Sequence, residues 1–281
     1  MVSGLGDAPH AACGFCHGGA FPVLAAPILT VHGSFDPTLM FDHDGLNCQA
    51  ATDRGRMIKR MVVQTALWLA AMAVLFFVAA GDWRWPQGWV FLGEVAVSTM
   101  AVNLWLLRHD PALLESRLSS PMQKDQRPWD RIFLPVSLFV FVSWLVLCAL
   151  DARRFGWSHV PLWVQAIGAG LIALCMIVVW QVFRFNTFAA PQVRMQVERQ
   201  QRAITDGPYR IVRHPMYAAA LLMFVGTPLL LGSWWGLLFV PIGAVGIGFR
   251  AVGEEDMLRH ELPGYEEYTR NVRYRMVPGL W

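Results

Sequence analysis

Apolar residues fall into long, nearly uncharged runs that short polar segments separate. A helix rises about 1.5 Å per residue, so roughly 20 apolar residues cross a hydrocarbon core that is about 30 Å thick. Six runs approach or reach this length, and we expect each to form a membrane-spanning helix. The fifth is short, and only Gly232 and Ser233 separate it from the sixth, which predicts a tight helical hairpin. The runs cover about 61–80, 88–107, 132–150, 162–183, 215–231 and 234–252.

The composition supports this pattern. The chain is 55% hydrophobic and only 15% charged, whereas soluble domains carry about 25% charged residues. We therefore predict an all-α fold, a polytopic membrane bundle of about six transmembrane helices that ends in the hairpin. Small residues at 168–170 and 243–248 predict close helix packing, and those of the sixth run predict neighbours on several of its sides.

Basic residues predict the orientation. Of the 23 Lys and Arg residues, only Arg84, Arg153 and Arg154 fall outside the segments that this topology places on one side. The positive-inside rule then puts both termini in the cytoplasm, and in a bacterium the host bilayer would be the inner membrane. The basic residues are spread over several loops and form no stripe, so we expect no nucleic-acid partner. The sequence leaves the oligomeric state open.

The first segment differs from the rest, with many prolines and glycines and no amphipathic period. Cys13–His17 matches the C-x-x-C-H pattern of haem attachment, and Cys48 with nearby histidines could extend it into a metal site. Haem attachment of this kind needs an exported segment, and no signal sequence precedes the motif. We expect instead a disordered leader, or translation that starts at Met57, and we assign no metal. The predicted parts are a leader over 1–56, N-terminal spans over 57–190 and a C-terminal cofactor-binding region over 191–281.

Candidate chemistry gathers at the two polar ends of the hairpin. Tyr209, His214 and Tyr217 stand at the start of the fifth span, and Arg250 and Glu254 stand at the end of the sixth. The hairpin would bring both groups to one membrane face. Aromatic rings with a carboxylate suit an organic cation, of which S-adenosylmethionine is one. The plainer interpretation is a solvated i,i+4 salt bridge between Arg250 and Glu254.

The ordered set of motifs resembles the isoprenylcysteine carboxyl methyltransferases and their bacterial relatives, a group that also includes phospholipid N-methyltransferases. The resemblance covers about 190–281, with looser similarity from Met57 onward. Two departures leave the shape of the acceptor tunnel open: Ala219 stands where a glycine often occurs, and the chain ends shortly after Pro278. The motifs are Gly207-Pro208-Tyr209-Arg210, Arg213-His214-Pro215-Met216-Tyr217, Arg250-x-x-x-Glu254-Glu255, Tyr265-x-x-Tyr268 and Val277-Pro278.

This resemblance implies a membrane methyltransferase that holds S-adenosylmethionine on the cytoplasmic side and takes a lipid-like acceptor from the bilayer. It implies that Arg250 is the catalytic, substrate-binding residue and faces the acceptor. A carboxyl acceptor is favoured because it is ionised at neutral pH and needs no base. The implied cofactor-binding residues are Gln196, Gln201, Arg202, Ala203, Ile204, Tyr209, His214, Pro215, Met216, Tyr217 and Glu254.

Other functions remain open on the sequence. One alternative is phospholipid N-methylation, and another is a non-catalytic membrane protein or transporter, although the spans hold few ionisable groups. A sterol-type reductase would need a nicotinamide site, and no G-x-G-x-x-G follows a strand pattern. Glu94 lies inside the second run near its external end, on the membrane face opposite the candidate site, so we give it no catalytic role.

Overall fold

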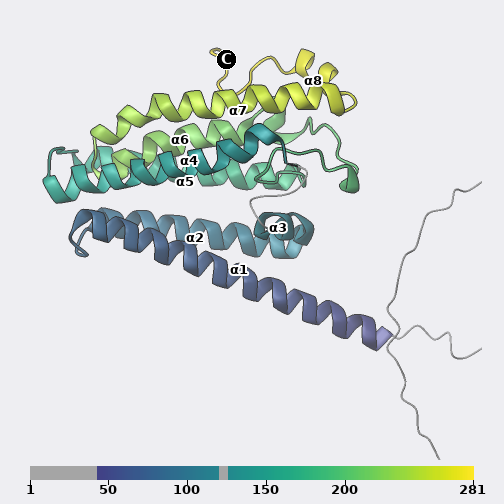
Figure 1. Cartoon of the computed structure of the whole chain (residues 1–281), viewed down its shortest axis with the longest axis horizontal. Helices are drawn as coiled ribbons and strands as arrows, with labels where there is room; N and C mark the ends of the chain where they lie inside the picture. The colour runs from purple at the N-terminus through teal and green to yellow at the C-terminus, as the bar shows by residue number, and fades with distance from the viewer. Residues whose placement is uncertain (1–42, 120–125) are drawn as a thin grey trace, which may run out of the picture. The chain divides into compact units, whose positions relative to one another are not determined.

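The computed structural model describes residues 43–119 and 126–281, which contain helices and no β-strand (Figure 1). The chain divides into two compact units, Met1–Leu46 and Asn47–Trp281, and the features below belong to the second. The all-α prediction is confirmed for the described residues. The helices are α1 (His43–Ala80), α2 (Pro86–His109), α3 (Pro111–Leu118), α4 (Pro128–Ala149), α5 (Leu162–Phe185), α6 (Pro215–Leu231), α7 (Phe239–Glu261) and α8 (Tyr265–Asn271).

Five helices are long and apolar enough to cross a membrane, and α6 is a shorter apolar helix of the kind predicted for the fifth run. Many of their large apolar side chains point outward; Val97 of α2, for example, is 72% exposed and Phe139 of α4 is 73% exposed. An outward apolar surface is what a bilayer requires, so these helices indicate an integral membrane protein. The five candidate spans are Arg54–Ala80, Pro86–His109, Pro128–Phe155, Leu162–Phe185 and Trp235–Glu261.

The first segment of the chain leaves two predictions without a test. The Cys13–His17 motif lies outside the described residues. The predicted start at Met57 falls inside α1, whose first described residue is His43. Translation from Met57 therefore stays a prediction.

Proline marks the first turn of several helices, where its missing N–H group costs no hydrogen bond. Helix α6 begins at Pro215, as the sequence predicts. Between α2 and α3, Asp110 accepts a hydrogen bond from the backbone N–H of Leu113 at 2.9 Å and so caps α3. Leu113 and Leu114 are fully buried, which fixes this short amphipathic helix against the bundle.

The closest helix contact joins α5 to α6. A Cβ atom added at Gly168 would lie 2.4 Å from the backbone nitrogen of Leu230, and one at Gly226 would lie 2.8 Å from the carbonyl oxygen of Gly168. Only glycine permits this approach. The glycines of α7 work differently, because Gly243 and Gly253 accommodate aromatic rings from α6 and α4. Helix α7 thus packs against both α6 and α4, in agreement with the predicted neighbours on several sides, and it keeps an exposed outer face.

The hairpin turn at the end of α6 depends on Gly232, whose φ of 89° lies in the left-handed region. Ser233 follows, and its hydroxyl donates to the buried carboxylate of Asp151 at 2.6 Å. Asp151 also accepts from the hydroxyl of Ser158 at 2.7 Å, so it joins the turn to the end of α4. The turn is longer than its two predicted residues, because a short 3-10 helix, Trp235–Leu238, precedes α7.

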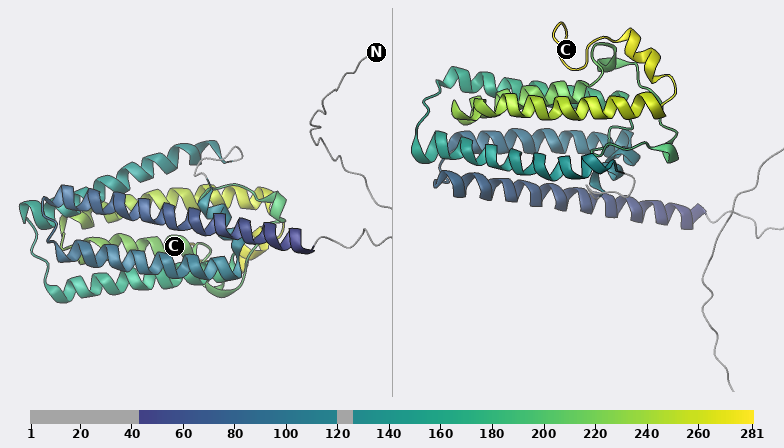
Figure 2. Two further views of the ribbon diagram at one scale, coloured as in Figure 1. Left: turned by 90° about the horizontal axis from the view of Figure 1, so that it is seen from below. Right: turned by 45° about the horizontal axis from the view of Figure 1, so that its top comes forward.

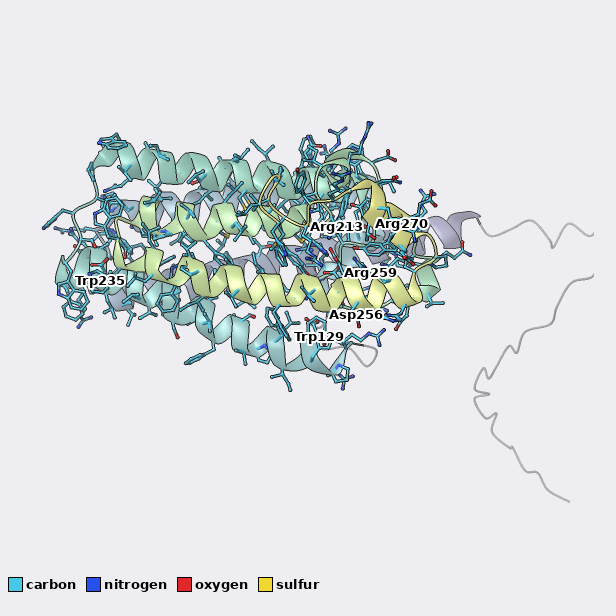
Figure 3. The ribbon with its side chains drawn as sticks, turned by 90° about the horizontal axis from the view of Figure 1, so that it is seen from above. Trp129, Arg213, Trp235, Asp256, Arg259 and Arg270 are labelled. Atoms are coloured by element: carbon cyan, nitrogen blue, oxygen red, sulfur yellow. The ribbon has the colours of Figure 1, made fainter. Side chains whose placement is uncertain are left out.

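The two ends of the helices carry different residues. Helices α4 to α7 run alongside one another in the views of Figure 2. Trp235 lies at one end, whereas Arg213, Arg259 and Arg270 lie at the other (Figure 3). The polar groups that precede α6 and follow the apolar part of α7 therefore share one end of the hairpin, as the sequence predicts.

Candidate functional site

A cavity of about 350 Å³ opens at the polar end of the hairpin, between the starts of α4 and α6, the end of α7 and the segment that joins α5 to α6. This volume lies within the range of small-molecule sites, about 300–1,000 Å³. The structure brings all the predicted site residues to its wall. They are Gln196, Gln201, Arg202, Ala203, Ile204, Tyr209, His214, Pro215, Met216, Tyr217, Arg250 and Glu254.

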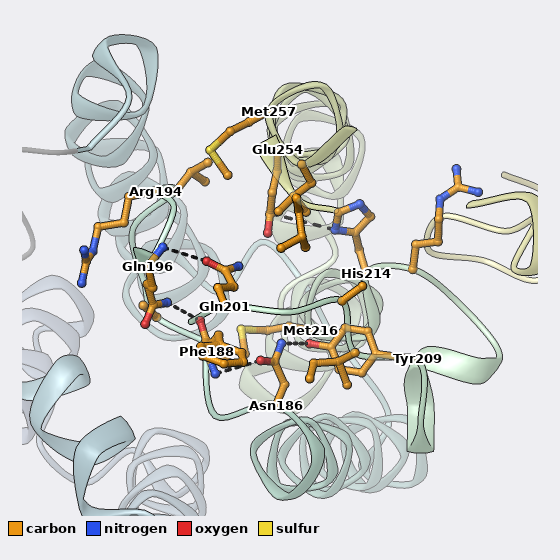
Figure 4. Close-up of a pocket in the computed structure, with 18 of the residues that line it drawn as sticks. Asn186, Phe188, Arg194, Gln196, Gln201, Tyr209, His214, Met216, Glu254 and Met257 are labelled. Carbon is orange, nitrogen blue, oxygen red and sulfur yellow. Dashed lines mark hydrogen bonds and ion pairs between the residues drawn. The ribbon is translucent and has the colours of Figure 1, made fainter. Parts of the chain in front are cut away.

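The two halves of the hairpin meet at Glu254. Its carboxylate accepts a hydrogen bond from the hydroxyl of Tyr217 at 2.6 Å, and the Nδ1 atom of His214 lies 3.9 Å from the same oxygen (Figure 4). The rings of His214 and Tyr217 stack with centroids 5.3 Å apart. Residues about forty positions apart thus converge through the turn at Gly232, and this predicted convergence is confirmed.

The adjacent acid, Glu255, points away from the cavity and holds the site together. Successive residues on a helix are turned by about 100°, so neighbouring acids face different directions. Glu255 is 2% exposed and accepts from Nε of Arg213 at 2.7 Å and from Nε of Arg275 at 3.1 Å. Nε2 of His214 lies 3.2 Å from the same carboxylate. Glu255 therefore fixes the orientation of His214 and binds the C-terminal tail.

Arg213 extends this anchor to the tail. Its Nη1 atom donates to the carbonyl oxygens of Val272 and Arg273 at 2.8 and 2.9 Å. The backbone N–H of His214 donates to the carbonyl oxygen of Arg275 at 2.8 Å. The tail and the start of α6 are thus connected by both side-chain and main-chain hydrogen bonds.

The segment between α5 and α6 forms the opposite wall. The side chain of Gln196 donates to the carbonyl oxygen of Phe188 at 2.7 Å, and its backbone N–H donates to the side chain of Gln201 at 2.8 Å (Figure 4). Gln200 between them adopts a left-handed φ of 50°, which lets the chain reverse after the short helix Val197–Arg199. These bonds hold an irregular segment in one conformation at the cavity.

Tyr209 connects three parts of the site. Its hydroxyl accepts from the side-chain amide of Asn186 at 2.6 Å, and its carbonyl oxygen accepts from the hydroxyl of Tyr268 in α8 at 2.8 Å. Burial raises the pKa of Tyr209 above its usual value. Its phenol therefore stays neutral at physiological pH and can act as a hydrogen-bonding group.

Arg250 lies in the cavity wall, but its partner is not Glu254. Its Nη2 atom lies 3.1 Å from a carboxylate oxygen of Asp130 and donates to the carbonyl oxygen of Pro191 at 2.5 Å. Asp130 is fully buried and also accepts from the backbone N–H of Val193 at 3.0 Å. The buried Nε atom of Arg250 makes no hydrogen bond to any part of the chain that the structure describes. The simple Arg250–Glu254 salt bridge is therefore wrong for this structure.

Several residues at or near the site were not predicted from the sequence. Arg117, which lines the cavity, and Asp130, which pairs with Arg250 behind its wall, come from segments far from the motifs, and nothing local indicated these positions. Asn186 and Phe188 had a weak signal, since they directly follow the fourth apolar run. Glu255 appeared in the motif without a role, and the surplus of arginines around 213 and 270–275 could have indicated its position.

The chemistry of the wall fits an organic cation with polar appendages. A partly exposed carboxylate, Glu254, stands beside the aromatic rings of His214 and Tyr217, which favours positive charge. Amide groups of Asn186 and Gln196 stand across the cavity and can recognise polar parts of such a ligand. In the described part of the chain no group of three His, Cys, Asp or Glu residues is arranged to hold a metal ion.

Comparison with known proteins supports this chemistry. Residues 163–262, from the start of α5 to just beyond α7, match the family model described as PEMT, phospholipid methyltransferase. The comparison with curated proteins finds no match. The family match supports a membrane methyltransferase of the phospholipid and isoprenylcysteine methyltransferase superfamily, and it does not separate the two branches.

Proposed function

We propose that the protein is an S-adenosylmethionine-dependent methyltransferase of the membrane, which methylates the carboxyl group of an isoprenylcysteine-like or other lipid-like acceptor. The observation that carries the proposal is the single cavity whose wall contains every residue that the motifs predict. The family match covers the same hairpin and also supports methyl transfer.

The residues of the cavity divide into two groups in this proposal. Glu254, oriented by Tyr217, takes a polar group of the cofactor, while the stacked rings of His214 and Tyr217 face its positive charge. The segment around Gln196 and Gln201 closes the opposite side. When bound, the cofactor supplies a methyl group on a sulfonium, which is a good leaving group.

Positioning can then supply much of the rate, because a well-oriented pair of reactants reacts as one molecule. Bound S-adenosylmethionine would supply its methyl group to an acceptor carboxylate held beside it, and the sulfur would keep the electron pair of the broken sulfur–carbon bond. The carboxylate is already ionised at neutral pH, so the chain need not remove a proton. The products are a methyl ester and a neutral thioether.

We propose that Arg250 lies beside the acceptor, as the sequence predicts, although its contacts differ from the predicted ones. A forked pair of hydrogen bonds would require its Nη2 atom to leave Asp130 and Pro191. In the observed arrangement the Nε–H group of Arg250 is buried and has no hydrogen-bond partner among the described residues. Arg250 therefore contributes positive charge to the wall beside the acceptor, and a direct hydrogen bond to the carboxylate would require its guanidinium group to move.

The cavity would open on the cytoplasmic side of the membrane. Arg213, Arg259 and Arg270 lie at its end of the helices (Figure 3), and loops rich in basic residues remain in the cytoplasm. Both chain termini would then be cytoplasmic. The acceptor would enter from the bilayer, with its polar end at the cofactor.

Phospholipid N-methylation is the second candidate, because it is the activity that the matched family's description names. An amine acceptor must lose a proton during methylation, so this reaction needs a base. The candidate base in the cavity wall is His214. Its Nε2 atom lies 3.2 Å from the carboxylate of Glu255, and this contact holds the ring in the wall.

Radiolabelled S-adenosylmethionine and a lipid extract test the proposal and separate the candidates. We expect label in the lipid fraction that mild base releases as methanol, which identifies an ester. Base-stable label would identify an amine or thioether and contradict carboxyl methylation. No transfer by protein that binds S-adenosylhomocysteine would support the non-catalytic alternative. We expect Arg250→Ala to reduce turnover far more than cofactor affinity.

A further inference from the structure

A second cavity, of about 290 Å³, lies between α2, α5 and α6. Two residues, Arg117 and Met216, line both this cavity and the candidate cofactor site. On α6 its wall extends from Met216 to Met223, which corresponds to about 10 Å of helix rise. It therefore extends from the candidate site into the apolar part of the bundle.

The wall of this second cavity is mainly apolar. Met176, Met216 and Met223 contribute flexible thioether side chains, which adapt to chains of irregular shape. The polar exceptions are Thr99 and Asn103, one helical turn apart on α2, and Arg117 on α3. The cavity thus combines room for an apolar chain with one permanent positive charge.

Arg117 is a half-buried cation without an acidic partner in the described part of the chain. Its Nη1 atom donates to the carbonyl oxygen of Ala189 at 3.0 Å, and its guanidinium carbon lies 4.5 Å from the ring centre of Phe183. Loss of hydration lowers the pKa of Arg117 to about 10, so it remains charged at neutral pH. Buried charges are costly unless a partner compensates them, which indicates that a ligand supplies the missing anion.

Arg250 is less suited than Arg117 to bind an additional anion. Its guanidinium already faces the buried carboxylate of Asp130, whereas the partners of Arg117 among the described residues are a carbonyl oxygen and an aromatic ring. The better site for an additional oxyanion is therefore Arg117, at the junction of the two cavities.

We propose that Arg117 binds the oxyanion of the acceptor while the adjoining cavity between α2, α5 and α6 holds the acceptor's apolar chain. This inference rests on the proposed function and narrows its substrate to a molecule with an anionic group at the end of a long apolar chain. A carboxylate and a phosphate share this chemistry. In the first case Arg117 holds the group that is methylated, and in the second it holds the headgroup phosphate.

Photocrosslinking with three diazirine lipids tests the assignment: a long-chain carboxylic acid, the matching alcohol, and a phosphate monoester with the same chain. With wild-type protein we expect the anionic probes to label the α2–α5–α6 cavity. Arg117→Gln should weaken labelling by at least one anionic probe about 10- to 100-fold, as for loss of a charge-assisted hydrogen bond, and leave the alcohol unchanged. Arg117→Lys should lose less, because it keeps the charge without the fork.

Arg184→Gln is the matched control, because Arg184 also stacks on an aromatic ring, Trp180, yet lines neither cavity. Equal labelling of wild type and Arg117→Gln by both anions would overturn the proposal, and so would equal loss of the anions and the alcohol. The probe that loses affinity identifies carboxylate or phosphate as the ligand. Thermal stabilisation by S-adenosylhomocysteine, measured on every variant, reports folding and tests the proposed function separately.

Discussion

Gly168 provides the sharpest test of how the hairpin is packed. In Gly168→Ala the new Cβ atom would lie 2.4 Å from the nitrogen of Leu230, 2.7 Å from the oxygen of Gly226 and 2.9 Å from the carbonyl carbon of Leu229. All three are backbone atoms, so no side chain can rotate away. Ordinary contact begins at 3.4 Å, so α5 and α6 must separate locally by about 1 Å, from 3.4 minus 2.4.

Such overpacking costs about 1–3 kcal/mol. In a protein of this size class, each kcal/mol shifts the midpoint of thermal unfolding by roughly 2–4 °C, which gives a decrease of roughly 2–12 °C. The assay is thermal unfolding of purified protein in one detergent, followed by intrinsic tryptophan fluorescence. A loss of S-adenosylhomocysteine affinity should accompany the decrease, because one wall of the cavity is the segment that directly follows α5 and another is the start of α6.

Gly170→Ala is the matched control on the same helix. Gly170 is exposed, and a Cβ atom added there would have no neighbour within 4 Å. Alanine is the better helix former by about 0.5–1 kcal/mol, so this variant should be as stable as wild type or more so. The reasoning fails if Gly168→Ala unfolds at or above the temperature of Gly170→Ala.

Two further predictions concern the C-terminal tail and the buried tyrosines near the site. Glu255→Gln should cost about 3–5 kcal/mol, because it leaves buried cations without their acid; limited proteolysis should cut the C-terminal tail faster, and unchanged cleavage would contradict this role. Burial raises the pKa of Tyr209, Tyr265 and Tyr268, whereas unfolded tyrosines ionise near pH 10. Their contribution to stability is therefore complete below about pH 10 and decreases as pH rises further. Unfolding temperatures measured from pH 8 to 11 should decrease only in the upper part of this range, and a flat profile would refute the argument.

Much of the fold could be predicted because the bilayer imposes a strong pattern. The apolar runs and the prolines predicted where helices lie, and α6 begins at Pro215 as expected. The hairpin placed His214 near Glu254 because the two runs have similar lengths and a short turn between them. Motif spacing then indicated a set of residues that line one cavity.

The remaining contacts depend on how each helix is rotated about its axis, which a single sequence does not reveal. The pairing of Arg250 with Asp130 joins residues 120 positions apart in sequence, from 130 to 250. Glycines in two runs looked equally suited to close packing, yet only Gly168 meets another helix backbone through its partner Gly226. Arg117 lies at the junction of the cavities because its helix, α3, is fixed against the bundle by the buried side chains of Leu113 and Leu114.

Binding of S-adenosylhomocysteine to the wild type and to Glu254→Ala tests the central claim most directly. At a ligand concentration 100 times the dissociation constant, wild-type protein should be stabilised by about 2.7 kcal/mol. Asp256→Ala is the control, because its acid lies two positions further along α7 and is 76% exposed. We predict stabilisation of the wild type and of Asp256→Ala, with little or none for Glu254→Ala. Absence of stabilisation in the wild type, or equal stabilisation of Glu254→Ala, would contradict a cofactor site at the end of the hairpin.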